Sequence, residues 1–268
     1  MGCEGGRRAV SRSGDLGKAD LHIHTAIGDG MAEVQELLDY VEEKTDLDVI
    51  AVTDHDNIRG AYATRELWAK GRYSFEVVTG VEVTALEGHL LALYLQEPPP
   101  ALRPVAEVLA AVHSQGGLCI IPHPLNWLTR SLSRRTIERI MRTGGDGVYF
   151  DGIELGNGAF AGRMNIKKAI RLNQERYHLA EVGGSDAHFL TAVGSAYTLF
   201  PGSTAADLRS AILAKQSKAA SGRHPSLLEI GPGQIARQAW RGITVTPRTL
   251  GWGPTAKSFV KRIFPFLP

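Results

Sequence analysis

Cysteine is scarce in this chain of 268 residues, which has only Cys3 and Cys119. Two cysteines this far apart exclude a disulfide framework, and nothing else in the sequence indicates an oxidising compartment. Cys119 lies in the apolar run Leu118–Ile121, where we expect a small buried side chain. A chain of this length buries enough apolar surface to fold without cross-links. We therefore expect a cytoplasmic protein held together by an ordinary hydrophobic core.

Long apolar runs and an excess of charge of one sign are also lacking. No stretch of 18 apolar residues occurs, so the sequence predicts no transmembrane segment. The net charge is +2, with 43% hydrophobic and 22% charged residues. This balance argues against a long nucleic-acid track, while a nucleotide or a short oligomer is compatible with it. The composition gives no indication of the oligomeric state.

Short apolar runs alternate with amphipathic stretches along most of the chain. The runs with the length and composition of strands are residues 19–24, 49–53, 75–82, 89–95, 118–121, 152–155 and 179–183. The amphipathic stretches that predict helices are residues 31–45, 60–70, 105–114, 133–142, 164–176 and 205–215. This alternation predicts a parallel α/β architecture, which an open doubly wound sheet and a closed barrel would satisfy equally well.

Composition divides the chain into three parts. Residues 1–17 are polar and glycine-rich and lack the apolar segment of a signal peptide, so we expect a disordered leader. Residues 18–226 contain the whole alternating pattern and are expected to form one domain. Residues 227–268 are basic and rich in Gly and Pro, without long periodic apolar stretches. We expect them to form a short irregular C-terminal extension.

Histidines and carboxylates recur where the predicted strands end. His22 and His24 are two positions apart on a predicted strand, so their side chains point to the same face, and Asp29 follows in a glycine-containing loop. Similar groups occur in four more places: Thr53–Asp56, Gly80–Thr84 with the nearby His89, Pro122–Pro124, and Gly184–His188. In parallel α/β folds the carboxyl ends of the strands meet at one edge, where active sites form. We therefore expect these residues to converge on one pocket.

These segments contain, in order, the motifs Asp-Leu-His-x-His-Thr, Thr-Asp-His-Asp, Gly-x-Glu-x-Thr, Pro-His-Pro and Ser-Asp-Ala-His. In this order they resemble the PHP (polymerase and histidinol phosphatase) family, over about Lys18 to Ser226. The resemblance implies a distorted seven-stranded (β/α)7 barrel, similar to a TIM barrel. It also implies two to three divalent metal ions, commonly Zn, Mn or Fe, with Mg as a further option.

The resemblance also implies which residues would hold the metals. One ion would be held by His22, His24, Glu82 and Asp186. Glu82 would bridge to a second ion, completed by His89 and His123, and a third would be held by Asp29, His55 and His188. All nine positions carry side chains that can ligate metal, which favours an active member of the family over a metal-free one.

Charge favours an anionic substrate for such a site. Three carboxylates and six neutral imidazoles carry about −3, so three divalent ions would leave about +3, or about +2 with a bridging hydroxide. A phosphate ester gains more from this excess than a neutral amide does. We expect in-line attack on the ester by a metal-bound hydroxide, without a covalent enzyme intermediate. The expected substrate is a small phosphorylated compound, such as a nucleotide or a short-oligonucleotide phosphomono- or diester.

Three further residues are candidates for supporting roles. Asp54 and Asp56 flank His55, and we expect them to hydrogen-bond ligating imidazoles or to cap turns, with a direct proton-transfer role also open. Arg130 follows the Pro-His-Pro motif, where it is either a phosphate clamp or an ordinary surface arginine.

Two other classes of function stay open on the sequence alone. A metal-dependent amidohydrolase or deacetylase would use a similar set of histidines and carboxylates, and a PHP module can also be non-catalytic. Some nucleotide-processing members of the family carry an inserted subdomain between the Gly-x-Glu motif and the next His. Here Glu82 and His89 are only seven positions apart, so we expect no insertion and a more open pocket.

Overall fold

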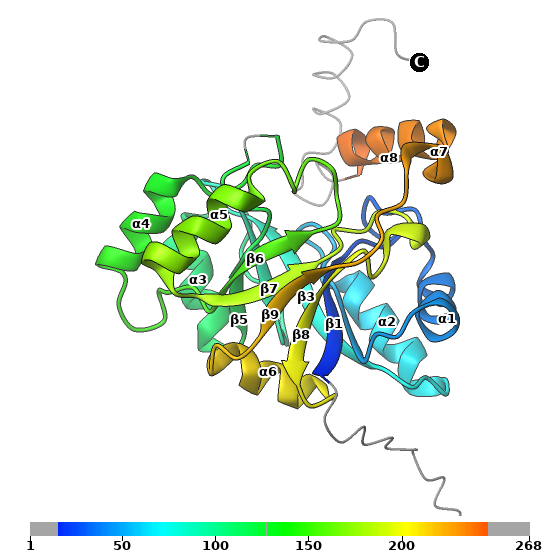
Figure 1. Ribbon diagram of the computed structural model, residues 1–268, viewed down its shortest axis with the longest axis horizontal. Coiled ribbons are helices and arrows are strands. Elements are labelled where there is room, and N and C mark those ends of the chain that lie inside the picture. Colours follow the sequence, from blue (N-terminus) through cyan, green and yellow to red (C-terminus); the bar gives the residue numbers. More distant parts are fainter. Residues whose placement is uncertain (1–15, 127, 246–268) are drawn as a thin grey trace, which may run out of the picture.

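The computed structural model of the protein describes residues 16–126 and 128–245 (Figure 1). The strands are β1 (Leu16–Ile23), β2 (Val49–Val52), β3 (Glu76–Thr84), β4 (His89–Leu93), β5 (Leu118–Ile121), β6 (Gly152–Asn157), β7 (Ala180–Gly184), β8 (Ala196–Pro201) and β9 (Lys218–Ser221). The α-helices are α1 (Val34–Lys44), α2 (Arg59–Lys70), α3 (Val105–Ser114), α4 (Arg134–Thr143), α5 (Ile166–Leu172), α6 (Ala205–Leu213), α7 (Leu227–Ile230) and α8 (Pro232–Thr244). A π-helical turn, η1 (Asn173–Tyr177), follows α5, and a 3₁₀ turn, η2 (Leu190–Ala192), precedes β8.

The strands form one curled sheet in the order β7-β6-β5-β4-β3-β2-β1-β8-β9. Strands β1, β2 and β3 are parallel, as are β5, β6 and β7, whereas β4 is antiparallel to both of its neighbours. The two ends of the sheet approach each other, because β7 lies against β8 and β9 and the segment after β7 bridges to β1 at Ile23 and Ala187. The sheet is therefore a nearly closed barrel.

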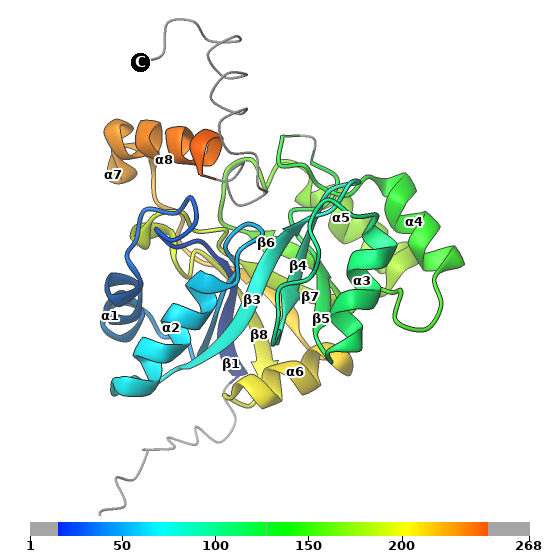
Figure 2. The ribbon, with the colours of Figure 1, turned by 180° about the vertical axis from the view of Figure 1, so that it is seen from behind.

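Alternating side chains of the strands pack into two apolar clusters. In β2, Val49 and Ala51 belong to a cluster inside the curled sheet, and Ile50 and Val52 to one between the sheet and the helices. Helix α6 contributes to the inner cluster and closes the end of the barrel where β1 begins (Figure 1). Helices α1 and α2 cover one flank and α3, α4 and α5 the opposite flank (Figure 2).

The helices form where apolar spacing and capping agree. In α1, Leu37, Leu38 and Val41 are buried, and Glu33 with Glu36 forms a capping box at its start. Thr204 and Asp207 form the same motif at the start of α6. None of the helices among the described residues has the length and apolarity needed to span a membrane.

A bulge in β1 sets the direction of the two histidines at its end. The pairing with β2 shifts by one residue between Asp20 and Ile23. As a result Leu21 packs into the inner cluster and Ile23 into the outer one, although residues two apart on a regular strand share a face. The bulge thereby turns His22 and His24 toward the inside of the barrel at its carboxyl end.

The structure differs from the sequence prediction in four respects. The sheet has nine strands instead of seven, because β8 and β9, which lie on either side of α6 in the chain, add two antiparallel strands beside β1 that the sequence prediction did not include. Strand β4 is antiparallel because the four residues after β3 are too few for a crossover. Residues 227–244, expected to be irregular, form α7 and α8, which begin with a Ser226–Glu229 capping box and with Pro232. The predicted leader lies outside the described residues except for Leu16 and Gly17, which belong to β1.

Candidate metal centre

One buried carboxylate, that of Glu82 on β3, collects imidazoles from five places in the chain. The Glu82 Oε1 atom lies 2.8 Å from His89 Nδ1 and 2.9 Å from His123 Nε2. Its Oε2 atom lies 3.2 Å from His22 Nε2 and 3.3 Å from both His24 Nε2 and His55 Nδ1. Since both oxygens serve different histidines, the carboxylate has the arrangement of a bridge between neighbouring cation positions.

Asp186, which follows β7, lies on the other side of the β1 histidines. Its Oδ1 atom is 3.5 Å from His22 Nε2 and 3.4 Å from His24 Nε2. Donors around one tetrahedral zinc ion, each about 2.0–2.2 Å from it, lie roughly 3.3–3.6 Å from one another. The spacing of His22, His24 and Asp186 therefore fits one ion.

The third predicted set also comes together. His188 Nε2 lies 3.4 Å from Asp29 Oδ2, and His24 Nδ1 lies 3.7 Å from Asp29 Oδ1. His24, Asp29, His55 and His188 each offer one ligand atom within 4.8 Å of the others. The structure thus gathers all nine predicted positions, but His24 takes part in two groups and His55 groups with Glu82 and His89 as well. Their role as ligands is a prediction that the geometry leaves open to test.

Several of these atoms are buried without a hydrogen-bond partner. They are Nδ1 and Nε2 of His24, Oδ1 of Asp29 and Nδ1 of His55. Leaving a buried polar atom unpaired costs about 1–3 kcal/mol, so native proteins rarely accumulate such atoms. Divalent cations between these donors would satisfy them, and the residues present therefore fit the metals that the family resemblance implies.

Carboxylates around the cluster fix the orientation of its imidazoles. Glu154 Oε1 lies 3.1 Å from His22 Nδ1, and Glu154 Oε2 accepts hydrogen bonds from the His123 amide at 2.6 Å and from Asn157 Nδ2 at 2.8 Å. The His123 Nδ1 atom lies 2.9 Å from Ser131 Oγ. Such partners hold a histidine so that its other nitrogen faces the metal position.

The three candidates for supporting roles lie in different environments. Asp54 accepts hydrogen bonds from the amide and the hydroxyl of Thr25, both at 2.6 Å, so it fixes the loop after β1. Asp56 Oδ1 accepts from the Thr84 amide at 2.6 Å, while its Oδ2 is buried and unpartnered. Arg130 has an exposed side chain, and its carbonyl accepts a hydrogen bond from the His89 amide at 2.8 Å.

The backbone at the centre adopts conformations that are uncommon for residues with a side chain. Asp56, His123 and Asp186 have φ angles of 50°, 27° and 53°. Such conformations cost on the order of 1–3 kcal/mol each and persist where the surroundings impose them, often at functional sites. Here they turn the side chains at the ends of β2, β5 and β7 into the barrel mouth.

Burial and neighbouring charges have opposite effects on the pKa values of the clustered side chains. Burial alone would lower the pKa of His24, but the carboxylates of Asp186 and Glu82, which lie 3.4 and 3.3 Å from its Nε2 atom, raise it to about 10. Burial lowers the pKa of His55 to about 3, in spite of Glu82. Burial would raise the pKa of Glu82 and Asp186, yet the surrounding imidazoles hold both well below their ordinary range. Metal binding at this cluster must therefore displace protons.

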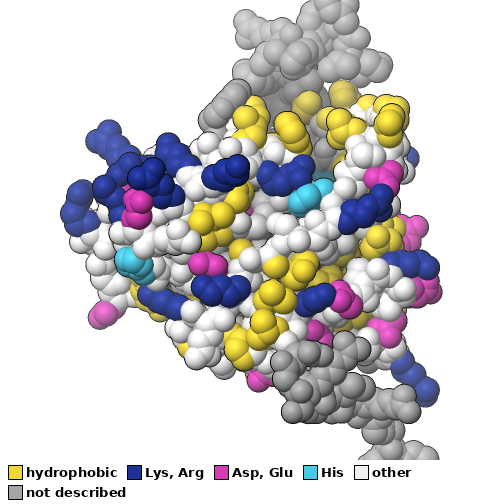
Figure 3. All heavy atoms as spheres, viewed as in Figure 1, with side chains coloured by type: hydrophobic (Ala, Val, Ile, Leu, Met, Phe, Trp, Pro, Cys, Tyr) yellow, Lys and Arg dark blue, Asp and Glu magenta, His cyan; other side chains and the backbone are white. Residues whose placement is uncertain are grey.

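The centre is buried at its middle and partly exposed at its edges. His22, His24 and Glu82 are almost fully buried, whereas the side chains of His89 and His188 keep 12% and 17% of their area exposed. With His55, which keeps 14% of its side-chain area exposed, these are the histidines through which solvent reaches the centre. Basic side chains also gather over α4 and α5, beside this end of the barrel (Figure 3).

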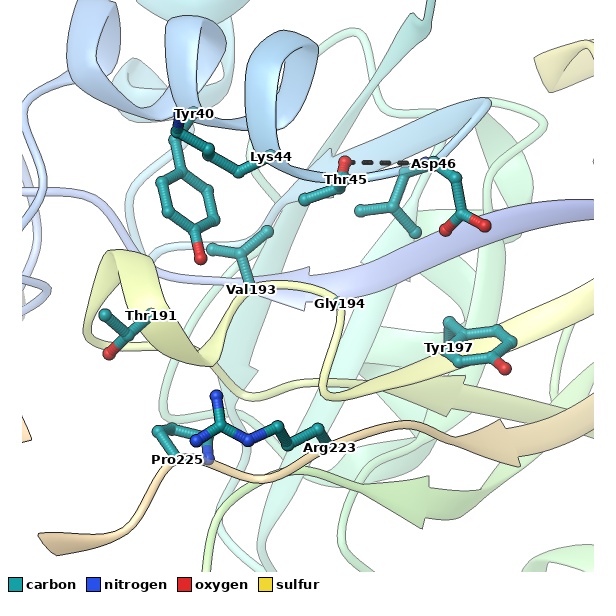
Figure 4. Close-up of a pocket in the computed structure, with 11 residues that line it drawn as sticks. Tyr40, Lys44, Thr45, Asp46, Thr191, Val193, Gly194, Tyr197, Arg223 and Pro225 are labelled. Carbon is teal, nitrogen blue, oxygen red and sulfur yellow. Dashed lines mark hydrogen bonds between the residues drawn. The ribbon is translucent and has the colours of Figure 1, made fainter. Parts of the chain in front are cut away.

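A second cavity, of about 250 Å³, lies outside the barrel (Figure 4). Tyr40 and Lys44 of α1 line it on one side, and Val193 and Arg223 on the other. Lys44 and Arg223 pair with the neighbouring glutamates Glu43 and Glu229. None of the nine clustered residues reaches this cavity, so we place the functional site at the carboxyl ends of the strands.

The sequence reasoning missed Glu154 as a functional residue. Glu154 is 1% exposed and supports both His22 and His123. The available signal was a carboxylate inside the short apolar strand Ile153–Leu155, where a charge without a partner would be costly. Arg241 was also missed, because its segment has no motif and contacts the loop after β1 from more than 200 positions away.

Comparisons with known proteins agree with this fold. The PHP-associated family matches residues 166–217. An uncharacterised protein of Methanocaldococcus jannaschii is 34% identical over 168 residues, which cover 59% of this chain and 90% of that protein. The 5′-3′ exoribonuclease Rnm of Salmonella typhimurium is 30% identical over 88 residues, 31% of this chain and 30% of that enzyme.

Solved structures show the same fold at low identity. A two-domain protein of Bacteroides vulgatus, which contains a predicted PHP-like metal-dependent phosphoesterase, has a TM-score of 0.62 at 19% identity, over 84% of this chain and 70% of that one. An amidohydrolase of Chromobacterium violaceum, solved with bound sulfate, has a TM-score of 0.51 at 16% identity, over 82% and 96% of the two chains.

A nearly closed α/β barrel that gathers imidazoles and carboxylates at its carboxyl end defines the class of barrel proteins built to hold divalent metals. Within that class, the ordered motifs and the matches above are those of one family, and the chain belongs to the PHP family.

Proposed function

We propose that the protein is a metal-dependent hydrolase of phosphate esters, with a nucleotide or short-oligonucleotide mono- or diester as substrate. The observation that carries the proposal is the convergence of five imidazoles on the buried carboxylate of Glu82, at 2.8 to 3.3 Å. Two to three divalent ions held there by the nine clustered residues would activate water, polarise a phosphoryl oxygen and stabilise the leaving oxygen.

Residues around the cluster fix the orientation of its side chains. Glu154 and Ser131 fix the outer nitrogens of His22 and His123, so the opposite Nε2 atoms face Glu82. Asp54 holds the loop after β1 through Thr25. This preorganisation means that little rearrangement is needed when substrate binds.

Asp56 and Arg130 are the candidates for direct contact with the reaction. Burial raises the pKa of Asp56, and one of its oxygens has no partner, so this carboxylate is suited to hold or transfer a proton. Arg130 is exposed, its carbonyl oxygen accepts a hydrogen bond from the His89 amide, and its guanidinium would bind a phosphate oxygen as a forked donor.

The test is a substrate panel on protein stripped of metal and reloaded with Mn²⁺ or Zn²⁺. A phosphodiester, a phosphomonoester and an amide are compared for wild type, for Glu82→Gln and for the matched control Glu66→Gln, which changes an exposed carboxylate on α2. We expect metal-dependent turnover of at least one ester by wild type and by the control, and none by Glu82→Gln.

The other classes of function give different results in the same panel. Turnover of the amide without turnover of either ester would replace the proposal by an amidohydrolase activity, for which the fold shared with the Chromobacterium violaceum enzyme gives a precedent. Absence of turnover on the panel, together with absence of bound metal by elemental analysis, would favour a non-catalytic module.

A further inference from the structure

Helix α8 lies at the same end of the barrel as the metal centre, beyond the loop that follows β1 (Figure 1). Its Arg241 reaches that loop: Nη2 donates hydrogen bonds to the carbonyl oxygens of Ala26, at 2.5 Å, and of Gly28, at 2.7 Å. The next residue, Gly242, comes so close to Asp29 that a β-carbon on it would lie 3.6 Å from Asp29 Oδ2. The end of α8 therefore packs directly on the loop that carries Asp29.

The loop that Arg241 contacts is short, and close packing leaves it few alternative conformations. The two carbonyls that Arg241 binds belong to Ala26 and Gly28, which both closely precede Asp29 in sequence, and the Gly28 amide donates a hydrogen bond to the Thr25 carbonyl at 3.0 Å. A β-carbon on Gly28 would lie 2.7 Å from Asp54, and one on Gly30 would lie 2.2 Å from the His24 carbonyl oxygen. The loop therefore packs against His24 and Asp54, and Arg241 holds it through the two carbonyl oxygens.

We propose that α8 completes the metal centre, with Arg241 as a positioning residue that holds the loop 26–30 so that the Asp29 carboxylate faces His24 and His188. The inference rests on the proposed function, because it takes Asp29 as a metal ligand. Asp29 is 4% exposed, and its two oxygens lie 3.7 Å from His24 Nδ1 and 3.4 Å from His188 Nε2.

The chemistry of arginine suits this task. Its guanidinium is always protonated and is a donor only, so it pairs with two carbonyls without competing for metal. The Nε atom of Arg241 is buried without a partner, which indicates that the side chain is enclosed between α8 and the loop.

The arrangement changes the expectation of an open pocket. The family's insertion between Glu82 and His89 is missing, but the end of α8 covers the Asp29 side of the centre instead. The side chains of His55, His89 and His188 remain more exposed than that of Asp29.

The test compares wild type with Arg241→Gln and Arg241→Lys, and with the control Arg237→Gln, an exposed arginine one turn earlier on α8. Hydrogen exchange of the amides of residues 26–31 is measured in metal-free protein, and Mn²⁺ and Zn²⁺ stoichiometry by equilibrium titration. In Arg241→Gln we expect faster exchange in this loop and about 10-fold weaker binding of one metal equivalent, with the other equivalents unchanged. Arg241→Lys should restore part of both, because its ammonium can reach one carbonyl.

The two readouts separate this inference from the proposed function. If wild type binds metal and Arg241→Gln matches it in loop exchange and in every metal affinity, Arg241 does not position Asp29 and the inference fails. If wild type binds no divalent metal at all, the proposed function fails, whereas slowed exchange that depends on Arg241 would still support the contact of α8 with the loop.

Discussion

Glu82 is buried among imidazoles that would repel one another if protonated. Its carboxylate is the common neighbour of the histidines at the ends of β1, β2 and β5 and at the start of β4, so it compensates their charge in metal-free protein and would join cations in loaded protein. No other carboxylate among the described residues lies within 3.3 Å of five imidazoles. A substitution at this single residue should therefore disturb the whole cluster.

Replacing Glu82 by Gln keeps the shape of the side chain and removes its charge. We expect at least one metal equivalent to be lost and ester turnover to fall by more than about 100-fold. Elemental analysis and turnover with saturating Mn²⁺ measure these effects. Unchanged metal content in Glu82→Gln would contradict the bridging role of this carboxylate.

His113 tests the electrostatics of the fold away from the site. Its Nε2 lies 2.9 Å from Asp151 Oδ2, its Nδ1 lies 2.8 Å from the Gly147 carbonyl oxygen, and its ring stacks on Tyr149 at 4.1 Å. Burial alone would lower the pKa of His113, but the hydrogen bonds to Asp151 and Gly147 raise it. The protonated ring therefore stabilises the folded state. This stabilisation is complete below the ordinary pKa of about 6.5 and is lost as the pH rises through the raised value.

We accordingly expect His113→Gln to lower the unfolding temperature more at about pH 5.5 than at about pH 9. Thermal unfolding of both proteins in metal-free buffer at the two pH values measures the difference. An equal loss of stability at both values would show that the charge of His113 contributes nothing.

At the scale of elements, the loop between β1 and α1 has no room for a side chain at Gly30. A β-carbon on Gly30 would lie 2.2 Å from the His24 carbonyl oxygen, which is backbone and cannot turn away. Gly145, in the connection after α4, has nothing within 4 Å of the same position and serves as the control.

We expect Gly30→Ala to destabilise the protein by about 1–3 kcal/mol and to weaken metal binding, because the loop must shift and carries Asp29 with it. Gly145→Ala should match wild type in both. Denaturant unfolding and metal titration provide the comparison, and wild-type stability of Gly30→Ala would mean that the loop is looser than described.

The elements were largely predictable where the apolar pattern is local. The spacing of Val34, Leu37, Leu38 and Val41 predicts α1 because one helix face is buried. Strand β8 was not predicted because only the 3₁₀ turn η2 separates it from β7, and β9 was not predicted because its four residues include no buried apolar side chain. Strand β4 runs antiparallel to β3 because the connection between them is short. The apolar pattern of β4 predicts a strand but does not give its direction.

At the scale of the whole molecule, the site is a product of barrel closure. Motifs predicted which residues would meet, since most of them lie at or just after the carboxyl ends of parallel strands, which meet at the same edge. They could not indicate that His24 faces two groups, that Glu154 supports two histidines, or that α8 returns to the Asp29 loop, because each depends on contacts between distant segments.

Metal binding should also stabilise the molecule as a whole, since the ligands come from most strands of the barrel and only the folded state brings them together. A free metal concentration of 100 times the dissociation constant would add about 2.7 kcal/mol to the free energy of unfolding. We expect chelation to lower the unfolding temperature and stoichiometric Mn²⁺ or Zn²⁺ to restore it. An unfolding temperature that is insensitive to both treatments would contradict a metal site at the barrel mouth.

The most direct test of the central claim is ester turnover by metal-stripped wild-type protein titrated with Mn²⁺, using a nucleotide phosphodiester and a phosphomonoester in parallel. We predict no turnover before titration and a rise that reaches its plateau at two to three equivalents of metal per chain. Turnover that survives complete removal of metal, or its absence for both esters at every metal concentration, would contradict the account.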